Sequence, residues 1–217
     1  MKQKGPISLR VLLALVLLVL VAGAVALVAI GSPSNASAKR EAARKQNLDA
    51  EALLTPVKQA PPLALRNYLG EPVNIDSYRG KAVLVTFLYT NCPDICPLIT
   101  SNLRVALNLL GAKGDSKVQI IAVSVDPKGD TPKAVASFLA RHEMTGRMQY
   151  LIGSAKELAV VWKAWGVGSE RDASQPQFVN HTGLVYGVTG SGKRLTVYPA
   201  EFRPAEIAHD VPLLAAR

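Results

Sequence analysis

The amino-acid sequence predicts an α/β domain, a three-layer α/β/α sandwich, with an N-terminal transmembrane helix in front of it. Two continuous apolar runs, residues 82–89 and 118–125, have the length and the β-branched content of strands buried on both faces. Apolar residues recur at helical spacing between them, which predicts a right-handed parallel crossover. Residues 11–30 contain no charged or strongly polar side chain. A helix of this length can cross a bilayer core of roughly 30 Å.

The net charge of +9 is concentrated around this N-terminal apolar run. Lys2, Lys4 and Arg10 precede the run, and further basic residues follow it. Residues 47–217 hold 18 Lys/Arg against 15 Asp/Glu. Because positive and negative charges are nearly equal in number in this part, the sequence shows no basic surface of the kind that binds a nucleic acid. We therefore expect no nucleic-acid partner.

The first 62 residues are predicted to be an anchor and a linker. We interpret residues 1–31 as an uncleaved signal anchor because a cleavable signal usually has a shorter apolar core, although Ala36-Ser37-Ala38 offers a cleavage site. The basic residues nearest the run lie before it and favour a cytoplasmic N-terminus. We therefore expect a single-pass protein of the cell membrane with its domain on the extracytoplasmic side. Residues 32–62, rich in Ser, Pro, Ala and basic side chains, are predicted to be a flexible tether.

The globular domain is predicted to cover residues 63–217. Turn signals around residues 69–80 indicate a short extended pair before the first buried strand. The later elements have clear boundaries: Gly111 and Gly114 end the first helix, Thr131-Pro132 begins the second, and Ser154 caps the third. Two further strands form a hairpin around Gly190-Ser-Gly192. The expected helices are 99–110, 131–142, 154–165 and 204–214, and the remaining strands are 150–152, 184–188 and 195–198. This order predicts a thioredoxin-like fold.

The two cysteines of the chain, Cys92 and Cys96, follow the first buried strand in a loop stiffened by Pro93 and Pro97. The loop leads directly into a helix, whose N-terminal N–H groups and dipole favour thiolate, the form that attacks disulfides and binds metals. A structural disulfide is the alternative. A ring of about five residues would gain only about 2 kcal/mol on the chain-entropy model, against nearly 5 for a ring of ~100, so this pair would be a poor staple.

The predicted topology brings one histidine toward the cysteines. Ligands of open α/β sheets gather beyond the carboxyl ends of the parallel strands, where Cys92 and Asp126 lie. If residues 184–188 run antiparallel to these strands, His181 lies at the same edge. Two thiolates and an imidazole suit Cu(I), and could hold Cu(II) with a further oxygen ligand. A structural zinc site would ordinarily need a fourth protein ligand.

The remaining candidates have simpler interpretations. His142 falls at a helix C-terminus, where a cation is favoured in any case, and His209 stands beside Asp210 on the last helix. Asp126 and Asp130 could supply carboxylates that orient an imidazole or meet a partner protein. Alternatively, Asp130 caps the following helix and Asp126 only begins a turn.

The chain resembles the Sco/SenC family of membrane-tethered, thioredoxin-fold copper chaperones for cytochrome c oxidase assembly. The resemblance covers about residues 63–217. Its motifs are Tyr78-Arg-Gly-Lys81, Phe87-Leu-Tyr-Thr-Asn-Cys-Pro-Asp-Ile-Cys-Pro97, Ser124-Val-Asp-Pro127 with Asp130-Thr-Pro132, and His181 placed 85 positions after Cys96.

This resemblance implies that Cys92, Cys96 and His181 bind one copper ion. It also implies that the loaded protein passes the copper to the dinuclear copper site of an oxidase subunit. We also expect a thiol reductant as a partner, because a Cys92–Cys96 disulfide cannot bind metal, and another copper carrier as the source of the ion. Many members place Asp directly before the histidine, whereas this chain has Asn180, which changes the charge that tunes metal affinity.

Three other functions remain open from the residues. A thiol–disulfide oxidoreductase would use Cys92 and Cys96 to reduce the cysteines of the oxidase copper site, but usually has two residues between its cysteines and needs no His181. A peroxidase would need one activated thiol, commonly with a distant resolving partner. A protein-interaction module would use the two cysteines only as a structural disulfide. The favoured interpretation is a metallochaperone rather than an enzyme.

Overall fold

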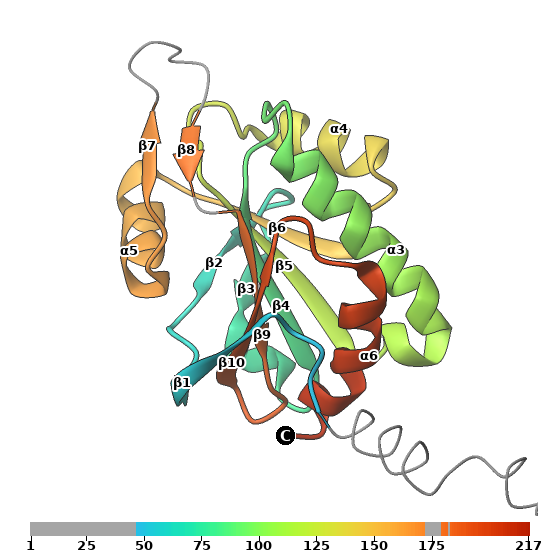
Figure 1. Ribbon diagram of the computed structural model, residues 1–217. Coiled ribbons are helices and arrows are strands. Elements are labelled where there is room, and N and C mark those ends of the chain that lie inside the picture. Colours follow the sequence, from blue (N-terminus) through green and yellow to red (C-terminus); the bar gives the residue numbers. More distant parts are fainter. Residues whose placement is uncertain (1–46, 172–178, 182) are drawn as a thin grey trace, which may run out of the picture. The chain divides into compact units, whose positions relative to one another are not determined.

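An eight-stranded mixed β-sheet forms the centre of the domain (Figure 1). The structure is a computed structural model that describes residues 47–171, 179–181 and 183–217, with backbone alone for 169–171, 180 and 181. The strand order is β1-β10-β9-β4-β5-β6-β2-β3. The strands are β1 (Ala52–Gln59), β2 (Ala64–Asn67), β3 (Pro72–Asn74), β4 (Ala82–Leu88), β5 (Val118–Ser124), β6 (Met148–Ile152), β9 (Leu184–Val188) and β10 (Lys193–Pro199).

The central strands have the predicted directions. β4 pairs in parallel with β5, and β5 with β6. β9 runs antiparallel to β4, with Val185 opposite Thr86, and forms the predicted hairpin with β10. Because β9 is antiparallel, its first residues lie at the edge where β4 and β5 end. The predicted site edge is therefore confirmed.

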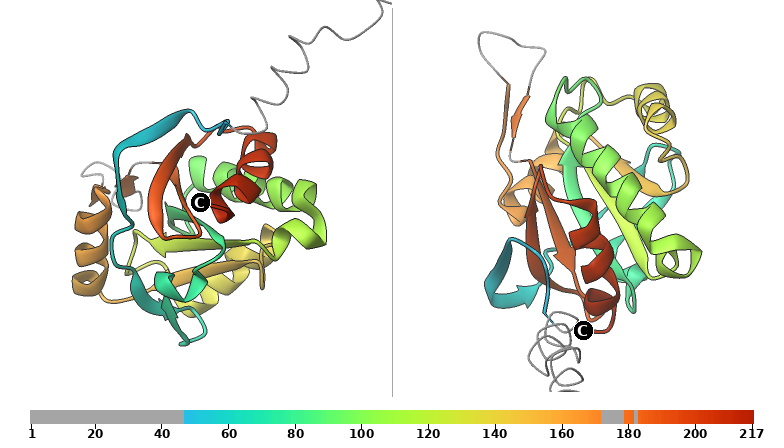
Figure 2. Two further views of the ribbon diagram at one scale, coloured as in Figure 1. Left: turned by 90° about the horizontal axis from the view of Figure 1, so that it is seen from below. Right: turned by 45° about the vertical axis from the view of Figure 1, so that its right-hand side comes forward.

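Helices cover both faces of the sheet (Figure 2). The crossovers β4-α3-β5 and β5-α4-β6 proceed in the same direction along the sheet, so right-handedness places both helices on one face. Helix α6 packs beside α3, and α5 follows β6 on the opposite face. The bounds are α3 (Ile95–Asp115), α4 (Pro132–Arg141), α5 (Ala155–Trp165) and α6 (Pro204–Ala215). This arrangement confirms the mixed three-layer architecture.

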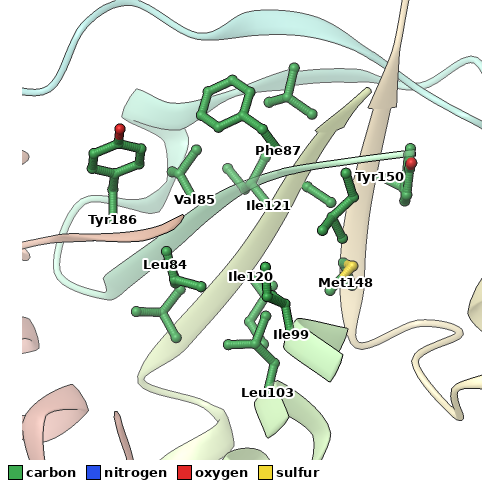
Figure 3. Packing of buried hydrophobic residues seen from close by; sticks show 14 of the residues in the cluster. Leu84, Val85, Phe87, Ile99, Leu103, Ile120, Ile121, Met148, Tyr150 and Tyr186 are labelled. Atoms are coloured by element: carbon green, nitrogen blue, oxygen red, sulfur yellow. The ribbon is translucent and has the colours of Figure 1, made fainter. Parts of the chain in front are cut away.

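The core lies on both sides of β4 and β5 (Figure 3). Leu84 and Ile120 face Ile99 and Leu103 of α3, whereas Val85, Phe87 and Ile121 point to the other side. There, Trp165 of α5 contacts Phe87 and Tyr186, with ring centroids 6.1 and 5.6 Å apart. Burial on both faces explains why these strands show continuous apolar runs instead of alternation.

Local signals define the helix ends. Thr131 caps α4 by accepting a hydrogen bond from the Ala134 N–H at 3.2 Å. Ser154 and Glu157 form a capping box at α5. Gly111, with φ of 64°, interrupts α3 near the expected end, and the chain continues for another short helical turn. The alternative that Asp130 caps α4 is wrong, since Thr131 has that role.

The segment expected as a tether contains a strand. Residues 52–59 form β1 and pair with β10, and the compact unit begins at Leu48 rather than near residue 63. Nearly all β1 side chains are exposed, so the strand is bound by its backbone and shows no apolar period. The predicted anchor, its alternative cleavage site and residues 32–46 of the tether lie outside the described residues.

Within the described part of the chain, one helix has the length and composition of a membrane span, and it is α3. Its buried side chains, among them Ile99 and Leu103, pack against the sheet, which makes it a core helix of the domain.

A second, two-stranded sheet was not predicted. β7 (Ser169–Arg171) pairs antiparallel with β8 (Val179–His181), and Ser169 stands opposite His181. Among the residues that the structure describes, these strands form their own sheet, without ladder pairing to the large one. Figure 1 shows β8 beside the loop that joins β4 to α3. The position of β8 must therefore be set by contacts other than those of the main ladder.

Candidate metal centre

The two cysteines lie where β4 ends and α3 begins. Both are thiols and both are buried, with Cys96 fully covered and Cys92 9% exposed. The Cys96 backbone N–H points at the Cys92 sulfur at 3.4 Å, so Cys92 occupies the anion-favouring end of the helix. The loop thus presents one sulfur near the surface and one beneath it.

The expectation that both sulfurs are primed as thiolates is wrong for Cys96. Burial raises the pKa of the Cys96 thiol far above its ordinary value, and hydrogen bonding and charge from Cys92 raise it further. The cost of burying a charge here exceeds what the helix N-terminus offers. Cys96 is therefore protonated at neutral pH, and a metal ion that binds its sulfur must displace the thiol proton.

A buried carboxylate fixes the start of the cysteine loop. Asp130 accepts hydrogen bonds from the Thr90 N–H at 2.8 Å, the Ser124 hydroxyl at 2.6 Å and the Tyr150 hydroxyl at 2.9 Å. Burial raises the pKa of Asp130, and these donors partly oppose the rise. Asp130 also stands near enough to Cys96 for its charge to raise the pKa of that thiol. Its role is thus to hold the loop that carries the sulfurs.

Asp126 lies in the neighbouring loop after β5 and is also buried. It accepts the Lys128 N–H at 3.2 Å, which confirms the alternative that it begins a turn. A Cβ at Gly129 would collide with the Asp126 carboxylate and lie 3.4 Å from the Asn91 amide nitrogen. The turn thus packs closely beside the cysteine loop, as the topology predicted.

Tyr89 contacts both cysteines and β8. Its hydroxyl is hydrogen-bonded to the Cys92 side chain and to the backbone of Val179, and its backbone reaches the Cys96 sulfur. Burial, followed by the charges of the nearby cysteines, raises the pKa of Tyr89 to about 12. Tyr89 is therefore a neutral hydrogen-bond donor at physiological pH.

The histidines fall in different parts of the domain. His181 is the last residue of β8, two residues after Val179, which the structure brings to Tyr89. The side chains of Asn180 and His181 lie outside the described residues, so ligation by His181 stays a prediction. His142 follows α4 with its ring 4.6 Å from that of Phe138, and His209 lies 2.8 Å from Asp210. Neither position is at the cysteine loop.

Among the side chains that the structure describes, no group of three or more His, Cys, Asp and Glu is spaced to hold a metal ion. The cysteines supply two sulfur donors, and a third must come from outside this set. Two adjacent thiols beside a helix N-terminus can bind a soft metal ion or close into a disulfide.

Several residues at this site were not foreseen. Tyr89 and Tyr150 belong to apolar strand patterns, which predict burial but not the direction of a hydroxyl. Thr90 acts through its backbone, which no side-chain pattern reveals. Gly183 stands against Ile95 only because β9 returns beside β4. Of these, Tyr89 had a usable signal, since it stands three residues before Cys92 at the predicted end of a strand.

Comparison with known proteins gives a consistent match. The SCO1/SenC family model matches residues 54–216. The mitochondrial SCO1 homolog of Mus musculus is 27% identical over 154 residues, which are 69% of this chain and 54% of the relative. A putative copper-binding protein of Stutzerimonas stutzeri is 30% identical over 117 residues, 51% of this chain and 57% of the relative. The chain thus spans little more than half the length of these curated relatives.

Solved structures match over more of their length. Apo Sco1 from Thermus thermophilus is 26% identical, with a TM-score of 0.65, and the match covers 79% of this chain and 98% of that one. ScoI from Bradyrhizobium japonicum, solved with copper bound, is 29% identical with a TM-score of 0.61, covering 72% and 99%. BsSco, a cytochrome c oxidase assembly protein with a reported disulfide switch, is 27% identical with a TM-score of 0.62, covering 76% and 98%. These matches confirm the thioredoxin-like fold.

Proposed function

This chain belongs to the SCO1/SenC family, and on that premise we propose that it carries one copper ion for the assembly of cytochrome c oxidase. The ligands we propose are Cys92, Cys96 and His181. The observation that carries the proposal is the pair of buried thiols at the end of β4, with Val179 of β8 in contact with Tyr89 beside them. Support also comes from a relative described as copper-binding and from the copper-bound ScoI of Bradyrhizobium japonicum.

The donor set fits copper as cargo. Two thiolates and one imidazole form a soft, low-coordinate site that suits Cu(I), and a further oxygen ligand would accommodate Cu(II). Cys92 is the more exposed of the two cysteines, at 9%, so we infer that an acceptor thiolate approaches from its side. Transfer then proceeds by ligand exchange: an acceptor ligand bonds to copper as a Cys92, Cys96 or His181 bond breaks, and the released thiolate regains a proton.

The recipient and the location extend this proposal. We infer delivery to the dinuclear copper site of the oxidase subunit, from a single-pass protein of the cell membrane whose domain lies on the extracytoplasmic side. Residues 1–31 would be the anchor, and another copper carrier would supply the ion. In an oxidising compartment a thiol reductant must keep the pair open, since a Cys92–Cys96 disulfide offers no thiolate.

A second function, thiol–disulfide exchange, is favoured by one specific observation, that Cys92 is the more exposed of the two buried thiols, at 9% against 0% for Cys96. The Cys92 thiolate would attack a disulfide of the oxidase copper site, and the Cys96 thiol would resolve the mixed disulfide. The target gains two electrons and two protons, and Cys92 and Cys96 become a disulfide that an external dithiol must reduce. The disulfide switch reported for BsSco is consistent with such chemistry.

Copper binding is tested by anaerobic titration of the reduced full chain with Cu(I) in competition with a chelator. We expect one tightly bound copper per chain, and a loss of about tenfold or more in affinity for His181→Ala, because a metal ligand is removed. His142→Ala is the matched control, since His142 lies at the end of α4, and should leave the affinity unchanged.

Two results would contradict the copper proposal. If the reduced chain binds no copper, or if His181→Ala binds as tightly as the wild type, the three-ligand site is wrong. A disulfide-exchange assay on a peptide with the oxidase cysteine pair would then decide the second function. Retained exchange by the His181→Ala variant would support the oxidoreductase.

A further inference from the structure

The sheet topology leaves the histidine-bearing strand without ladder bonds to the large sheet. β8 pairs with β7, and these two strands form a separate sheet in the described part of the chain. A metal ligand must be held within a few tenths of an ångström of its productive position. Some contact outside the ladder must therefore fix β8 relative to the cysteine loop.

One such contact lies before His181. The Tyr89 hydroxyl is hydrogen-bonded to the backbone of Val179 and to the side chain of Cys92. The backbone N–H of Val179 is the group that a phenol oxygen can accept from, and the phenol proton is then available to the Cys92 sulfur. Tyr89 and Val179 are 3% and 6% exposed, so water does not compete strongly for these bonds. One hydroxyl thus joins β8 to a sulfur.

A second contact lies after His181. A Cβ built at Gly183 would stand 2.7 Å from Cδ1 of Ile95 and 3.6 Å from Cβ of Ala200. Ile95 lies between the two cysteines, as the first residue of α3. Gly183 has no positive φ, and the atom that an added Cβ would meet is the tip of the Ile95 side chain, which would have to move aside. The absence of a side chain lets the chain lie directly on the cysteine loop.

The backbone beyond Gly183 is fixed as well. The Thr86 hydroxyl of β4 donates to the Leu184 carbonyl at 2.9 Å, and Thr86 stands opposite Val185 in the ladder. Residues 179 and 184 therefore both contact β4 or the residue that follows it, on either side of His181.

We propose that Tyr89 and Gly183 are positioning residues that hold the segment around His181 against the cysteine loop and so set the geometry of the metal site. This inference rests on the proposed copper function. Tyr89 acts by bonding β8 to Cys92, and Gly183 acts by leaving room for Ile95. Both act through His181 and supply no ligand of their own.

The first test removes only the hydroxyl. Tyr89→Phe in the reduced full chain should weaken Cu(I) binding by roughly 3- to 10-fold, the range expected for one buried hydrogen bond. In a His181→Ala background the same change should have no further effect. Tyr198→Phe is the matched control, because Tyr198 is also buried but bonds to Asp210, and its affinity should equal that of the wild type.

The second test uses a rescue. Gly183→Ala should weaken Cu(I) binding by about threefold or more, since the new methyl group displaces Ile95 or the chain. Ile95→Val in the same chain should restore the affinity, because it removes the atom that collides and leaves the next one at 3.7 Å. Gly153→Ala, where the nearest atoms are 3.4–3.6 Å away, is the control and should bind normally.

A third measurement needs no copper. Amide hydrogen exchange at Val179 should be about tenfold faster in Tyr89→Phe than in the wild type, and unchanged in Tyr198→Phe. The inference is overturned if Tyr89→Phe leaves both copper affinity and this exchange rate unchanged, or if its loss of affinity persists without His181. Failure of the wild type to bind copper would instead overturn the proposed function, and the exchange rate would still decide whether Tyr89 holds β8.

Discussion

Two buried carboxylates of this domain, Asp130 and Asp210, accept the same kinds of hydrogen bond but fix different segments of the chain. Asp130 bonds to the Tyr150 hydroxyl at 2.9 Å and accepts the Thr90 N–H at 2.8 Å. Asp210 bonds to the Tyr198 hydroxyl at 2.8 Å and accepts the backbone N–H groups of residues 49 and 50 at 2.7 and 2.9 Å. Each therefore joins a tyrosine of the sheet to an irregular segment far away in sequence.

The difference lies in what each segment carries. The segment held by Asp130 leads directly into the cysteine loop, and its carboxylate raises the pKa of Cys96. The segment held by Asp210 is the start of the domain, and the His209 ring nitrogen lies 2.8 Å from Asp210 and 3.6 Å from Asp49. A buried carboxylate is thus a general means of fixing an irregular backbone, and only its location connects it to chemistry. Variants can separate these two roles.

Removing either carboxylate should have the largest effect. Asp130→Ala leaves three buried donors without their acceptor, and Asp210→Ala leaves one buried and two partly buried donors. At about 1–3 kcal/mol for each buried donor, we expect Asp130→Ala to lose about 3 kcal/mol or more of unfolding free energy and Asp210→Ala somewhat less. Only Asp130→Ala should also weaken Cu(I) binding, measured under conditions where both variants remain folded. Equal copper affinities for the two variants would contradict a role of Asp130 in holding the site.

Copper binding should release protons. Because burial raises the pKa of Cys96, the metal must displace the thiol proton, and affinity should rise about tenfold per pH unit for each proton displaced. We expect at least one proton released per Cu(I) near pH 7, measured with an indicator dye in weak buffer. Copper uptake without proton release would show that Cys96 is already ionised or is not a ligand.

Substitution of Tyr150 and Tyr198, which donate to Asp130 and Asp210, should test the same difference between the two carboxylates with smaller losses of stability. Tyr150→Phe and Tyr198→Phe each remove one hydrogen bond to a carboxylate and should cost about 1–2 kcal/mol of unfolding free energy. Denaturant titration measures this loss, and Cu(I) competition should show weaker binding for Tyr150→Phe alone. A reversed order of copper affinities would mean that Asp210, not Asp130, is coupled to the site.

The smallest expected effect is a pH dependence of stability from Asp130. Its pKa in the folded protein is raised by burial above the ordinary value of 3.8, so the folded state holds the proton where the unfolded state has lost it. Stability from this group is therefore present below pH 3.8 and falls as pH rises to the raised pKa. The unfolding free energy of the wild type minus that of Asp130→Asn should decrease across this window, and an increase would contradict the direction of the shift.

Much of the fold followed from local patterns. β4 and β5 were predictable because burial on both faces makes a strand continuously apolar, and α4 and α5 because Thr131 and Ser154 cap them. β1 escaped prediction because it is held by backbone bonds at a sheet edge with exposed side chains. The β7–β8 pair escaped because three-residue strands leave too short a pattern.

The sequence by itself determined which reactive side chains are present and roughly where they lie. It placed two cysteines at the end of a buried strand and His181 near the start of an antiparallel strand. Local spacing and hydrophobicity encode such features directly. Only the tertiary structure decided the state of these groups. Burial keeps Cys96 protonated, Asp130 reaches across from another loop, and Tyr89 meets Val179 ninety residues later in the chain. These effects depend on solvent exclusion and on distances between segments remote in sequence, which no local pattern contains.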